Sequence, residues 1–184
     1  MTIKNLIGYS LSDCERLVET FNQPSFRARQ IHSWIYVHAV RDIEMMTNLS
    51  KDLRAKLTAE YRVGELSIES KDVSEDGTIK YLFKLADGQA IESVLMPFDE
   101  RGVFAVCLST QVGCAVNCDF CATGKIGFKR QLSAAEIVEQ LLFIKHDAGK
   151  DIKNVVLMGQ GEPLLNYDET LKAIRLINQS AEIG

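Results

Sequence analysis

The chain has 184 residues, of which 46% are hydrophobic and 25% charged, and its formal net charge is −4. This is the composition of a globular protein with one good core or two small ones, and the negative charge argues weakly against wrapping nucleic acid by bulk electrostatics. No stretch approaches the apolar length of a membrane span, and the first residues lack the layout of a signal peptide, so we expect a cytoplasmic protein without a membrane partner.

Residues 1–70 are predicted to form a helical domain. Ser12-Asp13-Cys14-Glu15 has the pattern of a capping box at the start of a first helix. Pro24 separates it from a second helix over residues 27–38, where apolar side chains recur on one face. Ser50 is suited to cap a third helix. We expect these helices to form a small bundle with its own minor core.

Residues 71–97 are predicted to form a β-hairpin that connects the helical domain to the rest of the chain. Segments 78–85 and 89–96 alternate with period two on either side of Ala86-Asp87-Gly88, which is typical of a hairpin turn. Residues 66–69 are a candidate third strand. We expect the hairpin to pack on the domain that follows.

Residues 98–184 alternate strand and helix, which indicates an α/β fold. An apolar strand over 103–108 precedes a cysteine-rich loop, and Ser133-Ala134-Ala135-Glu136 forms a capping box for a helix that ends at Gly149. A short buried strand over 154–158, a loop and a helix over 168–178 follow. This order is typical of the βαβ units of a parallel sheet.

The cysteine loop is the strongest chemical signal in the sequence. Cys114, Cys118 and Cys121 have the spacing C-x3-C-x2-C directly after a predicted strand, and such clustering in a cytosolic chain favours metal ligation over disulfides. Three thiolates on a 4Fe–4S cluster leave one iron open, and that iron can chelate S-adenosylmethionine (SAM) and deliver an electron to it. The main alternative is a structural zinc site with Cys107 as fourth ligand, although paired C-x2-C knuckles or nearby histidines would then be expected.

A second loop supports the cluster. Gly159-Gln160-Gly161-Glu162-Pro163 follows the next predicted strand, and the carboxyl ends of neighbouring parallel strands meet at one edge of a sheet. Gly161 allows close backbone approach, and Glu162 can accept a hydrogen bond from the ammonium group of SAM. A Gly-Glu pair alone is more often only a turn, so its position one β/α unit after the cysteine loop gives it weight.

The motifs resemble those of a known family. The cysteine spacing with Phe120 before the last cysteine resembles the radical SAM superfamily, and the runs 107–114, 120–124, 127–130 and 158–166 resemble the RlmN/Cfr group within it, as do 24–30 and 46–51. The resemblance implies the first two β/α units of a barrel, incomplete here, and a methyltransferase acting on C2 of an adenine in 23S ribosomal RNA, with transfer RNA a further candidate. The sequence of residues 162–166 resembles the C2-methylating branch more than the C8-methylating branch.

The resemblance also implies roles for single residues and partners. Phe120 would pack beside the adenine of SAM, and Glu92 would be the proton acceptor. The family uses two SAM molecules and a methyl-bearing cysteine near its C-terminus, with which Cys107 would pair as a disulfide. The helical domain would contact RNA, a flavodoxin-type protein would donate electrons, and the full-length protein would be a monomer. Without the resemblance, Cys107 reads as a buried strand cysteine and Glu92 as a solvent-facing strand residue.

The sequence also departs from that family. Its members are considerably longer, and no cysteine follows Cys121, so the methyl-carrying residue is missing from this chain. We therefore expect a truncated chain that is inactive alone, with apolar strand faces exposed in its C-terminal half; an excised piece or one part of a split protein remain alternatives. The functional alternative is a non-catalytic module that binds a cluster or zinc and contacts RNA.

Overall fold

The computed structural model describes residues 3–98, 102–150 and 152–181. These residues form two compact units: the first comprises residues 3–65 with the part of the last helix from Ile174 on, and the second comprises Leu66–Ala173. The described elements, in chain order, are β1 (Lys4–Asn5), α1 (Leu11–Thr20), α2 (Phe26–Tyr36), the 3-10 helix η1 (Ile43–Met45), α3 (Lys51–Glu60), β2 (Tyr61–Arg62), β3 (Ser67–Val73), β4 (Ile79–Lys84), β5 (Ala90–Pro97), β6 (Phe104–Cys107), β7 (Gln111–Val112), α4 (Ala122–Ile126), β8 (Arg130–Gln131), α5 (Ala134–Ala148), β9 (Ile152–Val156), the 3-10 helix η2 (Pro163–Asn166) and α6 (Tyr167–Ala181).

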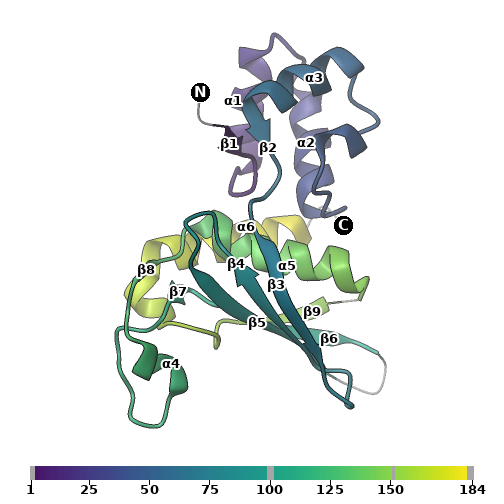
Figure 1. The fold of residues 1–184 in the computed structure, drawn as a ribbon. Coiled ribbons are helices and arrows are strands. Elements are labelled where there is room, and N and C mark those ends of the chain that lie inside the picture. The colour runs from purple at the N-terminus through teal and green to yellow at the C-terminus, as the bar shows by residue number, and fades with distance from the viewer. Residues whose placement is uncertain (1–2, 99–101, 151, 182–184) are drawn as a thin grey trace. The chain divides into compact units, whose positions relative to one another are not determined.

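The first unit is helical, as the sequence predicts, with β1 and β2 paired in parallel beside the helices (Figure 1). Ser50 caps α3 by accepting a hydrogen bond from the backbone N–H of Leu53. The predicted cap of α1 at Ser12 is wrong, because Ser10 holds that position. Ser10 is extended, its hydroxyl accepts from the N–H of Asp13, and the Asp13 carboxylate accepts from the N–H of Ser10. The capping box therefore starts two residues earlier, and Ser12 lies in the first turn.

The second unit is built on a five-stranded sheet in the order β3-β4-β5-β6-β9 (Figure 1). The first three pairings are antiparallel, and β6 pairs with β9 in parallel across the connection through α5. The mixed α/β class, the hairpin and the strand–helix–strand order are thus confirmed. The hairpin strands belong to the same sheet as β6 and β9, because β5 pairs directly with β6 from Val94 to Pro97.

Helix α5 covers one face of this sheet. Its capping box between Ser133 and Glu136 and its left-handed stop at Gly149 lie where the sequence places them. The Phe143 ring packs edge-on against Phe83 with centroids 5.0 Å apart, and Tyr81 donates a hydrogen bond to Asp147. Alternate residues of the strands therefore face α5 and are buried, while the residues between them lie on the opposite face.

Several short elements were not predicted: the paired two-residue strands β1 and β2, the paired two-residue strands β7 and β8, the 3-10 helices η1 and η2, and helix α4. Strand β3 extends to Val73, beyond the predicted 66–69, although all seven of its residues are exposed. None of the helices in the described part of the chain is long and apolar enough to cross a membrane.

Candidate functional site

The three predicted cluster ligands share one loop that is closed at its base. Residues 113–129 form the loop between β7 and β8, which pair as a separate two-stranded sheet. The N–H of Lys129 donates to the carbonyl of Val112 at 3.0 Å. The backbones of Gly113 and Gly127 touch, since a Cβ on Gly113 would lie 1.8 Å from the Gly127 carbonyl oxygen. The loop and α4 therefore form one closed segment that projects beyond the five-stranded sheet (Figure 1).

Within this loop, Cys118 and Cys121 form a tight turn in which the N–H of Cys121 donates to the Cys118 carbonyl at 3.0 Å. Cys121 occupies the N-cap of α4. The backbone N–H groups of Gly124 and Thr123 hold the pKa of its thiol below the usual value, which favours the thiolate that binds metal. Cys114, Cys118 and Cys121 are all partly exposed and free of disulfides.

The donor type is the one that iron–sulfur clusters use, since cysteine thiolates are their usual ligands. The three thiols are partly exposed on one closed loop. In the described ranges, no group of three or more His, Cys, Asp and Glu side chains is gathered around the position of a single metal ion. The structure therefore places the three cysteines on one loop without bringing their side chains together at one point.

Glu92 and Cys107 lie on the same face of the sheet, opposite α5. Val94 pairs with Cys107 between β5 and β6, and Glu92 is two residues from Val94 on the same strand, so their side chains point to one side. The Glu92 carboxylate is 45% exposed and lies 3.5 Å from the ammonium of Lys80. Burial raises the pKa of the Cys107 thiol.

The loop after β9 is bonded directly to the segment that leads into the cysteine loop. The carbonyl of Gln160 accepts from the N–H groups of Thr110 and Gln111 at 2.8 and 3.2 Å. The N–H of Glu162 donates to the side-chain oxygen of Gln111 at 3.0 Å. The structure thus places the loop after β9 beside the segment that leads into the cysteine loop, as adjacent parallel strand ends require.

Glycine is needed for this approach. Gly161 has φ +103°, and a Cβ there would lie 2.6–2.7 Å from the Cβ, Cγ and backbone nitrogen of Gln111. The Glu162 carboxylate accepts from the N–H of Leu164 at 3.0 Å and caps η2. One of its oxygens is therefore held by this hydrogen bond, which orients the carboxylate at the start of η2.

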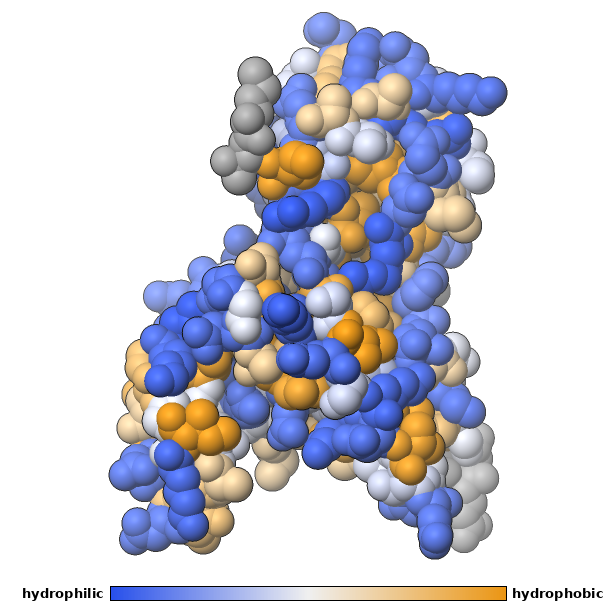
Figure 2. Space-filling view, viewed as in Figure 1, coloured by the Kyte–Doolittle hydropathy of each residue, from blue (hydrophilic) through white to orange (hydrophobic). Residues whose placement is uncertain are grey.

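Apolar side chains are exposed around these loops. Phe120 is 93% exposed and Met158 is 81% exposed, and Leu164 and Ile126 are also largely exposed. Figure 2 shows apolar surface (orange) in the part of the view where Figure 1 places α4. At this exposure the faces of the Phe120 ring are open to a flat ligand.

Two polar residues that the sequence did not single out connect this region. Gln140 on α5 and Ser109 after β6 are fully buried and are hydrogen-bonded to each other. One sequence feature could have pointed to Gln140. It is a glutamine among the apolar positions of α5, between Ile137 and Ile144, on a helix whose start is clear from its capping box. A buried amide of that kind needs partners, which periodicity alone does not identify.

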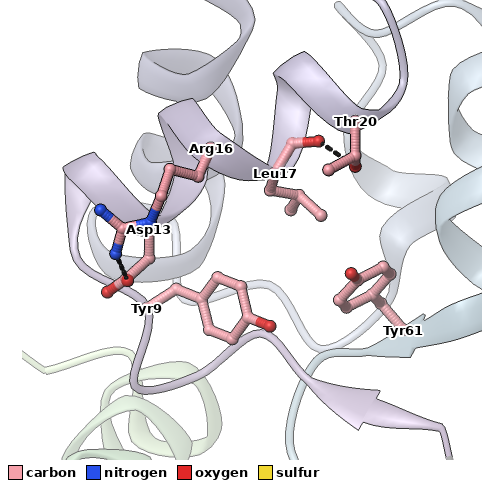
Figure 3. A pocket seen from close by; sticks show the side chains of 6 residues that line it. All are labelled: Tyr9, Asp13, Arg16, Leu17, Thr20 and Tyr61. Carbon is pink, nitrogen blue, oxygen red and sulfur yellow. Dashed lines mark hydrogen bonds and ion pairs between the residues drawn. The ribbon is translucent and has the colours of Figure 1, made fainter.

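The helical unit carries a separate open pocket of about 240 Å³ (Figure 3), lined by Tyr9, Asp13, Arg16, Leu17, Thr20 and Tyr61. The Tyr9 and Tyr61 rings meet edge-on with centroids 6.3 Å apart, and burial together with the Tyr61 hydroxyl raises the pKa of Tyr9. The Arg16 guanidinium, 69% exposed, pairs with the Asp13 carboxylate. Aromatic rings and a cation therefore share one opening.

Comparison with known proteins assigns the helical N-terminal part and the α/β part of the chain to two different family models. The model for the ribosomal RNA large subunit methyltransferase N-terminal domain matches residues 4–63, and that for the radical SAM superfamily matches residues 108–183. The "Probable dual-specificity RNA methyltransferase RlmN" of Acaryochloris marina is 44% identical over 183 residues, covering 100% of this chain and 51% of that protein. The protein of the same name in Rippkaea orientalis is 42% identical and is covered to 53%.

A crystal structure of a radical SAM methyltransferase from Sphaerobacter thermophilus has a TM-score of 0.87 at 40% identity, covering 95% of this chain and 52% of that one. The α/β unit with its closed cysteine loop is thus a radical SAM core. Taken with the N-terminal match and the relatives, nearly the whole chain is similar to the RlmN family of radical SAM RNA methyltransferases, which confirms the resemblance. It spans about half the length of the curated relatives that it matches.

Proposed function

We propose that this chain supplies the cluster-binding half of a radical SAM enzyme that methylates C2 of an adenine in 23S ribosomal RNA. The relatives are named as dual-specificity RNA methyltransferases, which supports a second RNA substrate, for which we propose transfer RNA. We further propose a cytoplasmic monomer served by a flavodoxin-type electron donor. The observation that carries the proposal is the closed loop with three accessible thiols, bonded through its leading segment to the Gly159–Glu162 loop.

Each residue has a proposed task at this site. Cys114, Cys118 and Cys121 would hold the 4Fe–4S cluster, which when bound supplies the electron that cleaves SAM. The three cysteines leave one iron without a protein ligand, so SAM has a position to bind. Gly161 lets its loop lie against Gln111 and would meet SAM through its backbone, and Glu162 would accept a hydrogen bond from the ammonium group of SAM.

Phe120, Glu92 and Cys107 complete the proposed set. The exposed Phe120 ring would stack on the adenine of SAM. Glu92 would accept the proton removed from the modified base, and Cys107 would resolve a covalent intermediate with RNA by forming a disulfide. Glu92 and Cys107 lie on the same face of the sheet, which supports a shared task for these two side chains. No cysteine follows Cys121, so the methyl-carrying residue is not among these 184 residues.

Anaerobic reconstitution tests the cluster. The proposal requires a brown protein with about four irons per chain, and it requires loss of that iron in Cys118→Ala. Cys14→Ala is the matched control, because Cys14 is fully buried in the helical unit and burial raises the pKa of its thiol to about 12. A colourless protein that binds one zinc would support the non-catalytic alternative instead.

The roles assigned to these residues are tested by analysing the modified RNA. These 184 residues alone should not form 2-methyladenosine, because they lack a cysteine to carry the methyl group. Mass spectrometry of nuclease-digested RNA measures this directly. Formation of 2-methyladenosine by the 184 residues would refute the assigned roles.

We also propose that the helical unit contacts RNA through the pocket in Figure 3, where Arg16 can meet a phosphate and Tyr9 a base. Arg16→Ala should weaken binding of a 23S ribosomal RNA fragment and lower the salt slope by about one counterion. Lys56→Ala is the control, since this lysine is similarly exposed on α3 and does not line the pocket. Equal effects of the two substitutions would contradict the assignment.

A further inference from the structure

The buried amide of Gln140 has all of its hydrogen-bonding capacity in use. Its oxygen accepts from the Ser93 hydroxyl at 2.7 Å and from the Ser109 N–H at 2.8 Å. Its nitrogen donates to the Ser109 carbonyl at 3.0 Å and to the Glu136 carbonyl at 3.1 Å. A primary amide offers two acceptor sites and two donors, so this side chain is completely satisfied.

Gln140 therefore holds both backbone groups of one residue, Ser109. The ladder between β5 and β6 ends at the Val94–Cys107 pair, while the chain continues to Ser109. There the glutamine amide takes the place of the next peptide of β5 and satisfies the N–H and carbonyl that leave the sheet. This fixes the point at which the chain turns toward the cysteine loop.

Ser109 carries the connection further through its hydroxyl. This hydroxyl donates to the carbonyl of Glu92 at 2.5 Å and accepts from the N–H of Gln160 at 2.9 Å. Gly159 approaches the same place, since a Cβ on it would lie 2.8 Å from the Ser109 hydroxyl. One serine thus joins the strand that bears Glu92 to the loop that bears Gly161 and Glu162, and one glutamine orients that serine.

We propose that Gln140 is a positioning residue for SAM: it contacts neither cofactor nor substrate but sets the Gly159–Glu162 loop, through Ser109, relative to the cysteine loop. This inference rests on the proposed function of the site. Groups that orient the residues around a metal centre typically change affinity or activity by about 10–100-fold when removed. The effect here should fall on SAM rather than on iron, because the Gln140 network meets the SAM loop directly and the cysteines only through intervening chain.

Gln140→Met tests this in the holoprotein reconstituted with iron and sulfide. Methionine keeps the volume and removes all four hydrogen bonds. We expect unchanged iron content, an affinity for SAM lowered about 10-fold or more, and a weakened effect of SAM on the electron paramagnetic resonance (EPR) signal of the reduced cluster. Ser93→Ala is the matched control, since it removes one bond to the same amide and leaves both bonds to Ser109. It should bind SAM like the wild type.

A milder variant covers the case in which Gln140→Met does not fold. Ser109→Ala keeps the glutamine clamp but removes the bond to the Gln160 N–H, so it should also lower SAM affinity while iron is retained. Wild-type SAM binding by Gln140→Met or by Ser109→Ala would overturn the positioning role, as would loss of iron in parallel with loss of SAM binding. A wild-type holoprotein whose cluster signal does not respond to SAM would overturn the proposed function itself.

Discussion

The contact between Gly161 and Gln111 makes a quantitative prediction for Gly161→Ala. The glycine has φ +103°, where an alanine costs roughly 1–2 kcal/mol of backbone strain. The new methyl group would also lie 2.6 Å from the Gln111 Cβ and 2.7 Å from its backbone nitrogen. Relieving such an overlap costs about 1–3 kcal/mol, because the neighbouring atom is backbone and cannot swing away. The total predicted loss of stability is about 2–5 kcal/mol.

Gly88→Ala separates the two contributions. Gly88 also has a positive φ, +82°, but a Cβ there meets nothing within 4 Å. It should therefore lose only the backbone part, about 1–2 kcal/mol. The two variants should differ by about 1–3 kcal/mol, which corresponds to roughly 2–12 °C in melting temperature for a chain of this size.

Thermal unfolding of the apoproteins, followed by far-ultraviolet circular dichroism under identical conditions, measures this difference. Because the apoproteins contain no cluster, the difference between the two variants reports only on the packing of the Gly161 loop against Gln111. A Gly161→Ala variant that melts at or above the temperature of Gly88→Ala would refute the argument that the loop must lie against Gln111.

Two further predictions concern titrating groups. His32 is 1% exposed with neither ring nitrogen hydrogen-bonded in the described chain, and burial lowers its pKa; the unfolded state therefore binds a proton first, and stability should fall as the pH drops below about 6.5. His32→Phe should flatten this dependence in pH-dependent urea unfolding, and an unchanged slope in that variant would contradict the assignment. Iodoacetamide at pH 7 should label Cys121 of the apoprotein before Cys107, because backbone amides lower the pKa of the first thiol and burial raises that of the second; peptide mass mapping with the reverse order would be inconsistent with this geometry.

The sequence predicted those parts of the fold that depend on local chemistry. The capping box at Ser133, the stop at Gly149 and the hairpin around Gly88 lie where expected, because each is set by a few adjacent side chains. The cap of α1 was misplaced because Ser10 and Ser12 both have an acidic residue three positions on, and only the packing of the helix decides between them. Strands β7 and β8 are too short to show a period, so nothing in the sequence marks them.

The candidate site was predictable as motifs and not as an arrangement. The spacing of the cysteines and the Gly159–Glu162 run are visible in one dimension. That Glu92 and Cys107 share a face follows only from the register of β5 against β6, which patterning does not fix to the residue. The bonds of Gln140 to Ser109 and of Gln111 to Glu162 depend on side chains from separate elements, so they appear only in the folded chain.

The central claim is that three cysteines hold a cluster whose remaining iron binds SAM. Electron–nuclear double resonance of the reduced, reconstituted protein with SAM labelled with ¹⁵N at its amino group tests it most directly. Our account predicts a hyperfine coupling from that nitrogen to the cluster, abolished when Cys118 is replaced by alanine. A cluster without coupling to the label, or one whose signal changes on substitution of Cys107 as a fourth ligand, would contradict it.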